Sequence, residues 1–368
     1  MNDKTKNIIV TTCFIIFIFS ISLANILTPD KEISATERRK LKQLSNMNLN
    51  NFTEKFEDYS LDQFIGRDFF RKVKAYVTYN IFNQKDNNKI YIVNGQVSKY
   101  TTSMDESSVI TAAKKFNKLY NKYLSNMNVY YSIIPNKNHF IAEKNGYPSI
   151  DYTKYVTLMN DNMNSNMKYI DLYNEININD YYSTDIHWRQ EKLKKIVNKL
   201  SNDMNFKIIS KLTENELDDF YGNYYGQAAL PIDSEKLIYL TNDIINSCKV
   251  KILNEETFEF EESEVYNLEA YNGIDPYDIF LSGAKPLIVI ENDNANTDKE
   301  LIIFRDSFGS SLAPLLIEGY KKITLIDLRY IATPLLTEEL VEFKSGQDVL
   351  IINYTDVLNN STTLKVLD

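Results

Sequence analysis

The chain has 368 residues, of which 43% are hydrophobic and 25% charged, so it is globular and can hold one large domain or two ordinary ones. Its formal net charge of −9 argues against a nucleic-acid partner, because phosphate binding needs a clustered basic face. The two cysteines, Cys13 and Cys248, have no ligand neighbours at zinc-site spacing and cannot form a disulfide framework, so we expect no metal and no cofactor.

The N-terminal end carries an apolar run. Lys4 and Lys6 precede residues 8–27, and a run of about 20 apolar residues is long enough to span a hydrocarbon core. Residues 22–24, Ser-Leu-Ala, also fit a secretory cleavage site. Because the run is long for a secretory signal, we favour an uncleaved anchor over residues 1–28. The anchor predicts a single-pass protein of the cell membrane, and either interpretation places the main body of the chain outside the cytoplasm.

The chain after the anchor alternates between linkers, helices and strands. Residues 29–50 are polar and predict a juxtamembrane linker ahead of a domain over 51–368. Aromatic residues at spacings of three and four predict helix over 52–82, and the same rule predicts a helix over 107–124. A hairpin is predicted over 89–99, with its turn at Asn94-Gly95, and a buried strand over 129–134.

The second half of the chain shows the stronger α/β pattern. A short strand is predicted over 168–172 and a helix up to about residue 204. The segment of about 213–300 is rich in glycine and proline with short alternating runs, which favours an inserted segment of antiparallel strands. Strands at 301–304, 323–326 and 349–352 then alternate with helices at 307–317 and 335–343, which predicts a parallel sheet covered by helices on both faces.

Two short motifs carry chemistry. The first is Asp185-Ile186-His187-Trp188, which holds one of only two histidines, and the second is Arg305-Asp306-Ser307-Phe308-Gly309. A serine hydroxyl is a weak nucleophile that needs an adjacent imidazole base, which in turn needs a carboxylate to orient it. Ser307, His187 and Asp185 are therefore the candidate catalytic residues of an acyl-transfer triad.

The position of Ser307 supports this interpretation, although simpler ones exist. The serine follows a predicted strand and opens a helix, whose free N–H groups could stabilise an oxyanion, and Gly309 would let a substrate approach the backbone. An Asp-Ser pair ahead of a helix is also an ordinary N-cap, His187 could be a structural histidine, and Asp185 could merely cap the following helix. His139 has no acidic residue nearby in the sequence and is taken as structural.

These residues resemble a known family. Asp185-x-His187-Trp188 is similar to the signature of the DHHW proteins, which belong with the AlgX/AlgJ-like alginate O-acetyltransferase group of the SGNH-hydrolase superfamily, and residues 305–309 resemble its serine block. Further similarities are Tyr59-x-x-Asp62-x-Phe64-x-x-Arg67-Asp68, the turn at residues 94–95 and Pro135-Asn136-Lys137. Ile186 stands where the family name has a second histidine, and Arg305 where ordinary SGNH enzymes have glycine.

The resemblance implies a three-layer α/β SGNH-hydrolase-like domain with a central parallel sheet and a circularly permuted motif order. It implies an O-acetyltransferase or acetylesterase acting on an extracellular polysaccharide, with Arg329 and Tyr354 as weaker candidates for holding the acyl oxygen or the sugar. It also implies an acetyl donor supplied by a membrane-bound O-acyltransferase. Whether the chain transfers or hydrolyses the acetyl group stays open.

A second hypothesis has no catalysis. The chain contains 26 tyrosines and one tryptophan, and tyrosine faces suit stacking on sugar rings, although buried aromatic residues are ordinary core material. With the inserted segment, this composition also fits a non-catalytic glycan-binding or assembly accessory protein of the cell envelope.

Overall fold

The computed structural model describes residues 2–34, 36–44, 51–229 and 232–367. They form two compact units: Met1–Asn88 with Tyr225–Ile232, and Lys89–Tyr224 with Asp233–Asp368. We call them the N-terminal unit and the sheet unit and describe each by itself. The linker expected at 29–50 includes residues 35 and 45–50, and the insertion expected at about 213–300 includes residues 230–231, all of which lie outside the described residues.

The N-terminal unit begins with the helix α1, Asp3–Leu27, in which Asn2 accepts a hydrogen bond as N-cap. Its mean hydropathy reaches 2.3, and in the described part of the chain it is the helix long and apolar enough to cross a membrane. The helix is therefore a candidate membrane anchor or signal sequence. The unit continues with a two-stranded hairpin and two helices: β1 Ile33–Ser34, β2 Arg39–Lys40, α2 Phe52–Asp62 and α3 Arg67–Tyr76, the last extended by a π-turn at Val77–Ile81.

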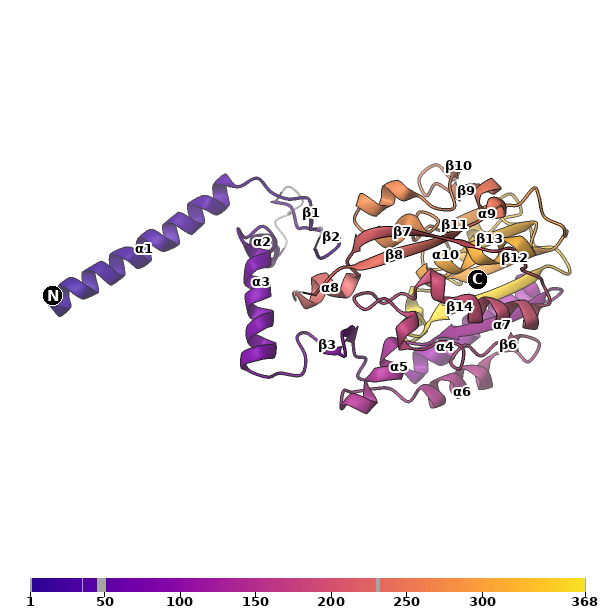
Figure 1. Cartoon of the computed structure of the whole chain (residues 1–368), viewed down its shortest axis with the longest axis horizontal. Helices are drawn as coiled ribbons and strands as arrows, with labels where there is room; N and C mark the ends of the chain where they lie inside the picture. Colours follow the sequence, from indigo (N-terminus) through magenta and orange to yellow (C-terminus); the bar gives the residue numbers. More distant parts are fainter. Residues whose placement is uncertain (1, 35, 45–50, 230–231, 368) are drawn as a thin grey trace. The chain divides into compact units, whose positions relative to one another are not determined.

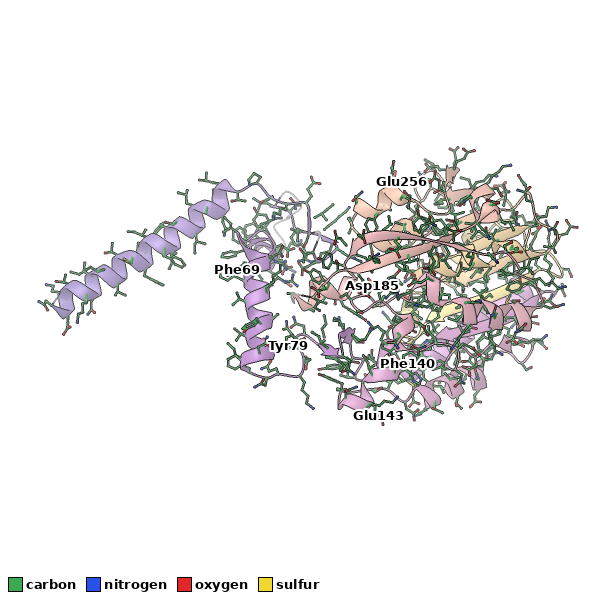
Figure 2. All side chains as sticks on the ribbon, in the orientation of Figure 1. Phe69, Tyr79, Phe140, Glu143, Asp185 and Glu256 are labelled. Carbon is green, nitrogen blue, oxygen red and sulfur yellow. The ribbon has the colours of Figure 1, made fainter. Side chains whose placement is uncertain are left out.

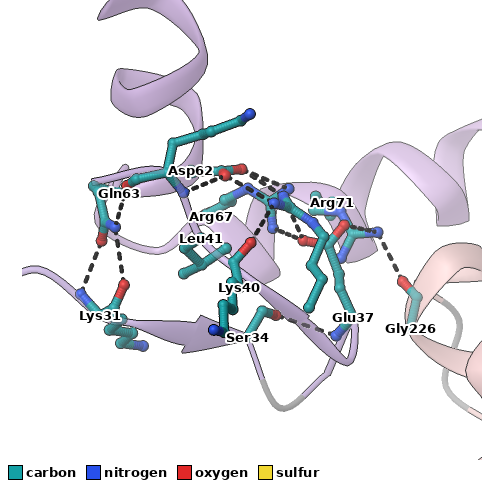
Figure 3. A network of polar contacts seen from close by, with 12 residues as sticks. Lys31, Ser34, Glu37, Lys40, Leu41, Asp62, Gln63, Arg67, Arg71 and Gly226 are labelled. Carbon is teal, nitrogen blue, oxygen red and sulfur yellow. Dashed lines mark hydrogen bonds and ion pairs between the residues drawn. The ribbon is translucent and has the colours of Figure 1, made fainter. Parts of the chain in front are cut away.

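A charged network holds these short elements together (Figure 3). Glu37 pairs with Arg39 at 3.1 Å, with Arg71 at 3.2 Å and also with Arg67. Asp62 accepts two hydrogen bonds from Arg39. Arg71 in turn donates to the carbonyl of Gly226, in the short helix α8, Asn223–Ala228, at 2.7 Å. Several partly buried charges share partners here, which makes the network a stronger constraint than isolated surface pairs.

The sheet unit is built on eight strands in the order β10-β9-β11-β13-β12-β14-β5-β6. Their bounds are β5 Asn128–Ile134, β6 Lys168–Tyr169, β9 Lys249–Leu253, β10 Phe260–Ser263, β11 Leu287–Glu291, β12 Glu300–Arg305, β13 Lys322–Ile326 and β14 Asp348–Tyr354. The five strands from β13 to β6 are parallel, as predicted, whereas β11, β9 and β10 are antiparallel. The sheet is mixed because strands of the segment expected as an insertion extend its edge.

Two hydrophobic cores lie on opposite faces of this sheet. The strands alternate between them: in β12, Leu301 and Ile303 belong to one core, and Ile302 and Phe304 to the other. The first core is covered by α7, Lys194–Met204, and α10, Ser307–Leu312, and the second by α4, Glu106–Leu119, and α6, Tyr152–Asn162. Because parallel strands bury both faces, they are nearly all apolar. The predicted three-layer α/β architecture is confirmed (Figure 1).

The remaining elements pack around this framework. They are the hairpin strands β3 Ile90–Val93 and β4 Gln96–Lys99, the hairpin strands β7 Thr213–Phe220 and β8 Glu235–Thr241, and the short helices α5 Lys137–Ile141, α9 Asp243–Ser247 and α11 Thr355–Leu358. The turn of the first hairpin is at Asn94-Gly95, both with positive φ, as predicted.

The helix predicted over 335–343 is wrong. A short 3₁₀ turn at Thr333–Leu335 is followed by a single hydrogen-bonded turn in which Val341 donates to the carbonyl of Thr337. The two buried side chains of this segment, Leu336 and Val341, are five residues apart. A helix would place them about 140° apart around its axis, so both could not face the same core.

Candidate active site

The sheet brings the two predicted motifs to the edge where its parallel strands end. Asp306 follows β12 and caps α10, with its Oδ1 accepting from the N–H of Phe308 at 3.1 Å. Ser307 is therefore the first helical residue and not the cap. Between Leu301 and Ile317 it is the one residue that is not buried. The carboxyl ends of parallel strands are where α/β proteins place their functional groups.

Asp185, His187 and Ser307 form one chain of hydrogen bonds. Nδ1 of His187 lies 2.6 Å from Oδ1 of Asp185, and Nε2 lies 2.8 Å from Oγ of Ser307. A carboxylate only accepts, so Nδ1 carries the proton and Nε2 is left to accept from the serine hydroxyl. Ser307, 120 positions from His187, thus completes the order and spacing of groups that an activated serine requires.

Asp185, labelled in Figure 2, is held by several hydrogen-bond donors. Its side chain is fully buried, its Oδ1 also accepts the N–H of His187 at 3.0 Å, and its Oδ2 accepts the N–H of Asn223 at 2.7 Å. Fixed donors of this kind prevent the carboxylate from rotating away from the imidazole. The helix-cap alternative does not apply, because Arg189 and Leu193 stand at the cap positions of the next two helical segments.

The imidazole of His187 is packed between aromatic rings. The ring of Tyr277 lies parallel to it, with centroids 3.9 Å apart and planes 8° apart, and Phe308 approaches it at 4.7 Å. Tyr277 and Trp188 both donate to the hydroxyl of Ser311, at 2.7 and 2.8 Å. Burial raises the pKa of Tyr277 well above its ordinary value, so its hydroxyl stays a donor.

The turn that leads into Asp185 is fixed by Glu235. This carboxylate accepts the N–H groups of Ser183 at 2.8 Å and of Thr184 at 2.9 Å, together with the hydroxyl of Thr184. Gly222 packs directly against the same turn, since a Cβ at that position would stand 2.2 Å from the carbonyl carbon of Thr184. The backbone around Asp185 therefore tolerates little displacement.

A buried lysine also binds the turn that leads into Asp185. Lys137, the first residue of α5, is fully buried, and its three N–H donors are shared among four backbone carbonyls within hydrogen-bond distance of Nζ: Val97 at 2.7 Å, Tyr182 at 2.8 Å, Ser183 at 3.1 Å and Asp185 at 3.2 Å. Burial lowers the pKa of Lys137 to about 7, against the opposing charges of Glu235 and Asp185. The lysine thus ties β4 to the backbone on both sides of Thr184.

A second charged cluster, made of Arg305, Asp306, Asp327 and Arg329, includes the two residues that precede Ser307 in the sequence. Arg305 is fully buried and pairs with Asp327 at 3.8 Å. Asp327 also accepts two hydrogen bonds from the guanidinium of Arg329, at 2.6 and 2.9 Å, and one from its backbone N–H at 3.0 Å. Burial raises the pKa of Asp306, although the charge of Arg329 and the N–H groups of Tyr354 and Phe308 oppose this shift. Both arginines pair with Asp327, and the charge of Arg329 partly offsets the burial of Asp306.

The weaker candidates take different positions. Arg329 keeps 22% of its side chain exposed beside Asp327. Tyr354 is buried, and its ring stacks on Phe308 at 4.7 Å. Gly309 is also buried: its N–H donates to the carbonyl of Asp306, and a Cβ would meet the Arg305 side chain at 2.6 Å. Packing against Arg305 thus accounts for this glycine. Ile186 lies partly buried against the core.

Sequence reasoning missed several residues that position the triad. Four of them belong to no motif and lie 36 or more positions from Asp185 and His187 in the sequence: Tyr277, Ser311, Glu235 and Asn223. No local pattern therefore indicated that they would contact the triad or its supports. Lys137 had a signal, because a lysine directly after a buried strand and Pro135-Asn136 is an unusual core residue. In the described part of the chain, no group of three His, Cys, Asp or Glu side chains is arranged to hold a metal ion.

Comparisons with known proteins agree with this architecture. No protein-family model and no curated protein sequence matches the chain. Among solved structures, a DHHW family protein from Eubacterium siraeum is 18% identical over 77% of this chain and 97% of its own, with a TM-score of 0.63. Bacillus cereus PatB1 is 18% identical over 74% and 97%, with a TM-score of 0.59, and PatB1 with a sulfonyl adduct gives 0.60 over 76% and 100%.

These likenesses bear on the fold and not on the activity, because the identity is low. The resemblance to the DHHW group, drawn from residues 185–188 and 305–309, is confirmed at that level, as is the mixed α/β sheet with helices on both faces. The chain has the fold of the DHHW family protein and of PatB1.

Proposed function

We propose that this chain is a serine-dependent O-acetyltransferase or acetylesterase that acts on a polysaccharide outside the membrane to which α1 anchors it. The observation that carries the proposal is the hydrogen-bonded chain from Asp185 through His187 to Ser307. The chain shares its fold with PatB1, which is known with a sulfonyl adduct.

The geometry suggests the following steps. Oγ of Ser307 attacks the carbonyl carbon of an acetyl ester while Nε2 of His187 takes the hydroxyl proton. The tetrahedral intermediate collapses, the ester C–O bond breaks, and the imidazolium returns the proton to the departing alcohol. The acetyl group is then held as an ester on Ser307. A sugar hydroxyl or a water attacks this ester, again with His187 as base, and releases the serine.

Each neighbour has a role in these steps. Asp185 keeps the proton on Nδ1 and stabilises the imidazolium that forms at each proton transfer. Tyr277 and Phe308 hold the ring in the plane that directs Nε2 towards Ser307. Transfer requires that water be kept from the acetyl-serine, whereas hydrolysis requires that it enter. A membrane-bound O-acyltransferase is the proposed source of the acetyl group for a transferase.

The first experiment measures acetyl release from a chromogenic acetyl ester by the full chain in detergent. Release that disappears in Ser307→Ala and persists in Ser345→Ala supports the proposal, since Ser345 is an exposed serine far along the chain from both motifs. An aryl sulfonyl fluoride gives a second readout, because it should add one sulfonyl group to Ser307 with loss of fluoride. PatB1 is known with a sulfonyl adduct.

The second candidate function is a non-catalytic glycan-binding accessory protein. It rests on the abundance of tyrosine in the chain. A correctly folded protein that neither releases acetate nor reacts with the sulfonyl fluoride would favour it. Addition of a polysaccharide acceptor to the ester assay separates a transferase from an esterase, because only a transferase places the acetyl group on the sugar.

A further inference from the structure

The N-terminal unit exposes large apolar side chains on α2, α3 and the π-turn. The aromatic side chains on α3 and just after it are exposed by more than half: Phe69 is 64% exposed, Phe70 54%, Tyr76 56% and Phe82 67%. Others on the same segment are Phe52, Phe56, Leu61, Ile65, Val73 and Ile81. So many exposed aromatic and aliphatic side chains on one short segment are unusual for a surface that meets only water.

Helix α3 divides its residues between two faces. Phe69, Phe70, Val73 and Tyr76 fall within one sector of about 120° around the helix, and Lys72 and Lys74 lie just beyond its two borders. The other face carries Arg67 and Arg71, which the charged network binds to Glu37 (Figure 3). The network therefore fixes which face of α3 is left exposed. An aromatic face flanked by lysines is the composition of a helix that lies at a lipid surface.

Hydrogen bonds join the α2–α3 junction to the end of α1 and the residues just after it. The N–H of Ile65, between α2 and α3, donates to the side chain of Asn25 in the last turn of α1 at 2.7 Å. Gln63 exchanges two hydrogen bonds with the backbone of Lys31, both 2.9 Å, and the hydroxyl of Tyr59 donates to Asp30 at 3.0 Å. The α2–α3 junction is thus bonded to the end of the helix that is long enough to span a membrane.

We infer that the aromatic face of α3 is a second membrane contact, which lies in the headgroup region of the bilayer that α1 crosses. If α1 spans the hydrocarbon core, its last turn lies at the lipid–water boundary, and the hydrogen bond to Ile65 holds the α2–α3 junction there. Phe69, Phe70 and Val73 then insert among the acyl chain ends, while Lys72 and Lys74 reach the phosphate groups. The N-terminal unit would be a membrane-seated base and not a free linker.

The test places spin labels on the full chain in vesicles of phosphatidylcholine and phosphatidylglycerol. Single cysteines replace Phe69 or Val73 in a Cys13→Ser, Cys248→Ser background, with Phe17→Cys in α1 as the lipid reference and Glu256→Cys in the sheet unit as the water reference. Accessibility to oxygen and to a water-soluble nickel chelate is measured for each label. We expect residues 69 and 73 to resemble residue 17, with high oxygen and low nickel accessibility.

Two outcomes overturn the inference. Nickel accessibility at 69 and 73 equal to that at 256 would place the face in water. Low accessibility to both reagents would mean that protein covers it, either the sheet unit or a second copy of the chain. A readout on the unsubstituted chain guards against misfolded variants: hydroxyl radicals from the aqueous phase should modify Phe69 several-fold more slowly than Phe258, although their exposed fractions are 64% and 48%. Equal rates would count against the inference.

Discussion

Tyr277 lies flat on the imidazole of His187, with ring centroids 3.9 Å apart and planes within 8°. The contact fixes the plane of the ring, and the Tyr277 hydroxyl is anchored in turn on Ser311 at 2.7 Å. Because Tyr277 acts on the imidazole through its ring and is held by Ser311, we regard it as a positioning residue for His187.

Replacing Tyr277 with leucine should lower the rate of acetyl release about 2- to 10-fold, because an aromatic pair is worth about 0.5–1.5 kcal/mol beyond burial. Tyr277→Phe keeps the ring and loses only the bond to Ser311, so its rate should stay closer to that of the wild type. The measurement is kcat with the chromogenic ester. Identical rates for Tyr277→Leu and the wild type would show that Tyr277 does not position the imidazole.

Asp185→Asn should keep the shape of the site and lose most of the activity. The amide cannot accept at both positions, so either the Nδ1–H of His187 or the N–H of Asn223 meets an NH₂ group. In the serine-protease template the matching change lowers kcat about 10⁴-fold. Single-turnover ester cleavage by the purified variant measures the effect. A variant that remains folded and within tenfold of wild type would refute the proposed role of Asp185.

Gly222→Ala should destabilise the sheet unit and lower activity together. The new Cβ would stand 2.2 Å from the Thr184 carbonyl carbon and 2.3 Å from the Asp185 nitrogen, and neither backbone atom can move without shifting Asp185. We expect a loss of about 3 kcal/mol or more, as for overpacked or strained core sites.

Gly95→Ala is the matched control for that experiment. Gly95 has a φ of 81° and no atom within 4 Å of the added Cβ, so only backbone strain of about 1 kcal/mol is expected. Urea unfolding of both variants in detergent gives the comparison. A Gly222→Ala variant no less stable than Gly95→Ala would contradict the tight contact at Thr184.

Lys137 should make stability depend on pH. Its pKa of about 7 in the folded chain lies below the value of about 10.4 for an unfolded lysine. Between these values the unfolded chain binds one more proton, so the free energy of unfolding rises with pH by about 1.4 kcal/mol per unit. Below pH 7 both states are protonated and the contribution is constant.

The control for the lysine is Lys137→Met, which has no proton to bind. The difference in unfolding free energy between wild type and this variant should shift in favour of the wild type as the pH rises from 7 to 10. A difference that does not change with pH would mean that the four carbonyl acceptors keep the ammonium charged in spite of its burial.

Several features of the fold were readable from local pattern alone. The apolar runs at 129–134, 301–304, 323–326 and 349–352 predicted the central parallel strands, because strands buried on both faces have few polar residues. The antiparallel strands β9, β10 and β11 were harder to place. The alternating runs over about 213–300 indicated antiparallel strands, yet the pairing of β11 with β13 is a contact between segments that no local pattern encodes.

The sequence by itself determined which residue types were available for chemistry: one Asp-x-His motif, and one serine between a buried strand and a helix. Only the tertiary structure decided that Asp185, His187 and Ser307 lie within hydrogen-bond distance of one another. The tertiary structure alone also places Tyr277 against His187, and Glu235 and Lys137 against the turn that leads into Asp185. The physical reason is that local propensities act over a few residues, whereas these contacts arise where the parallel strands end together and the loops that follow them must pack.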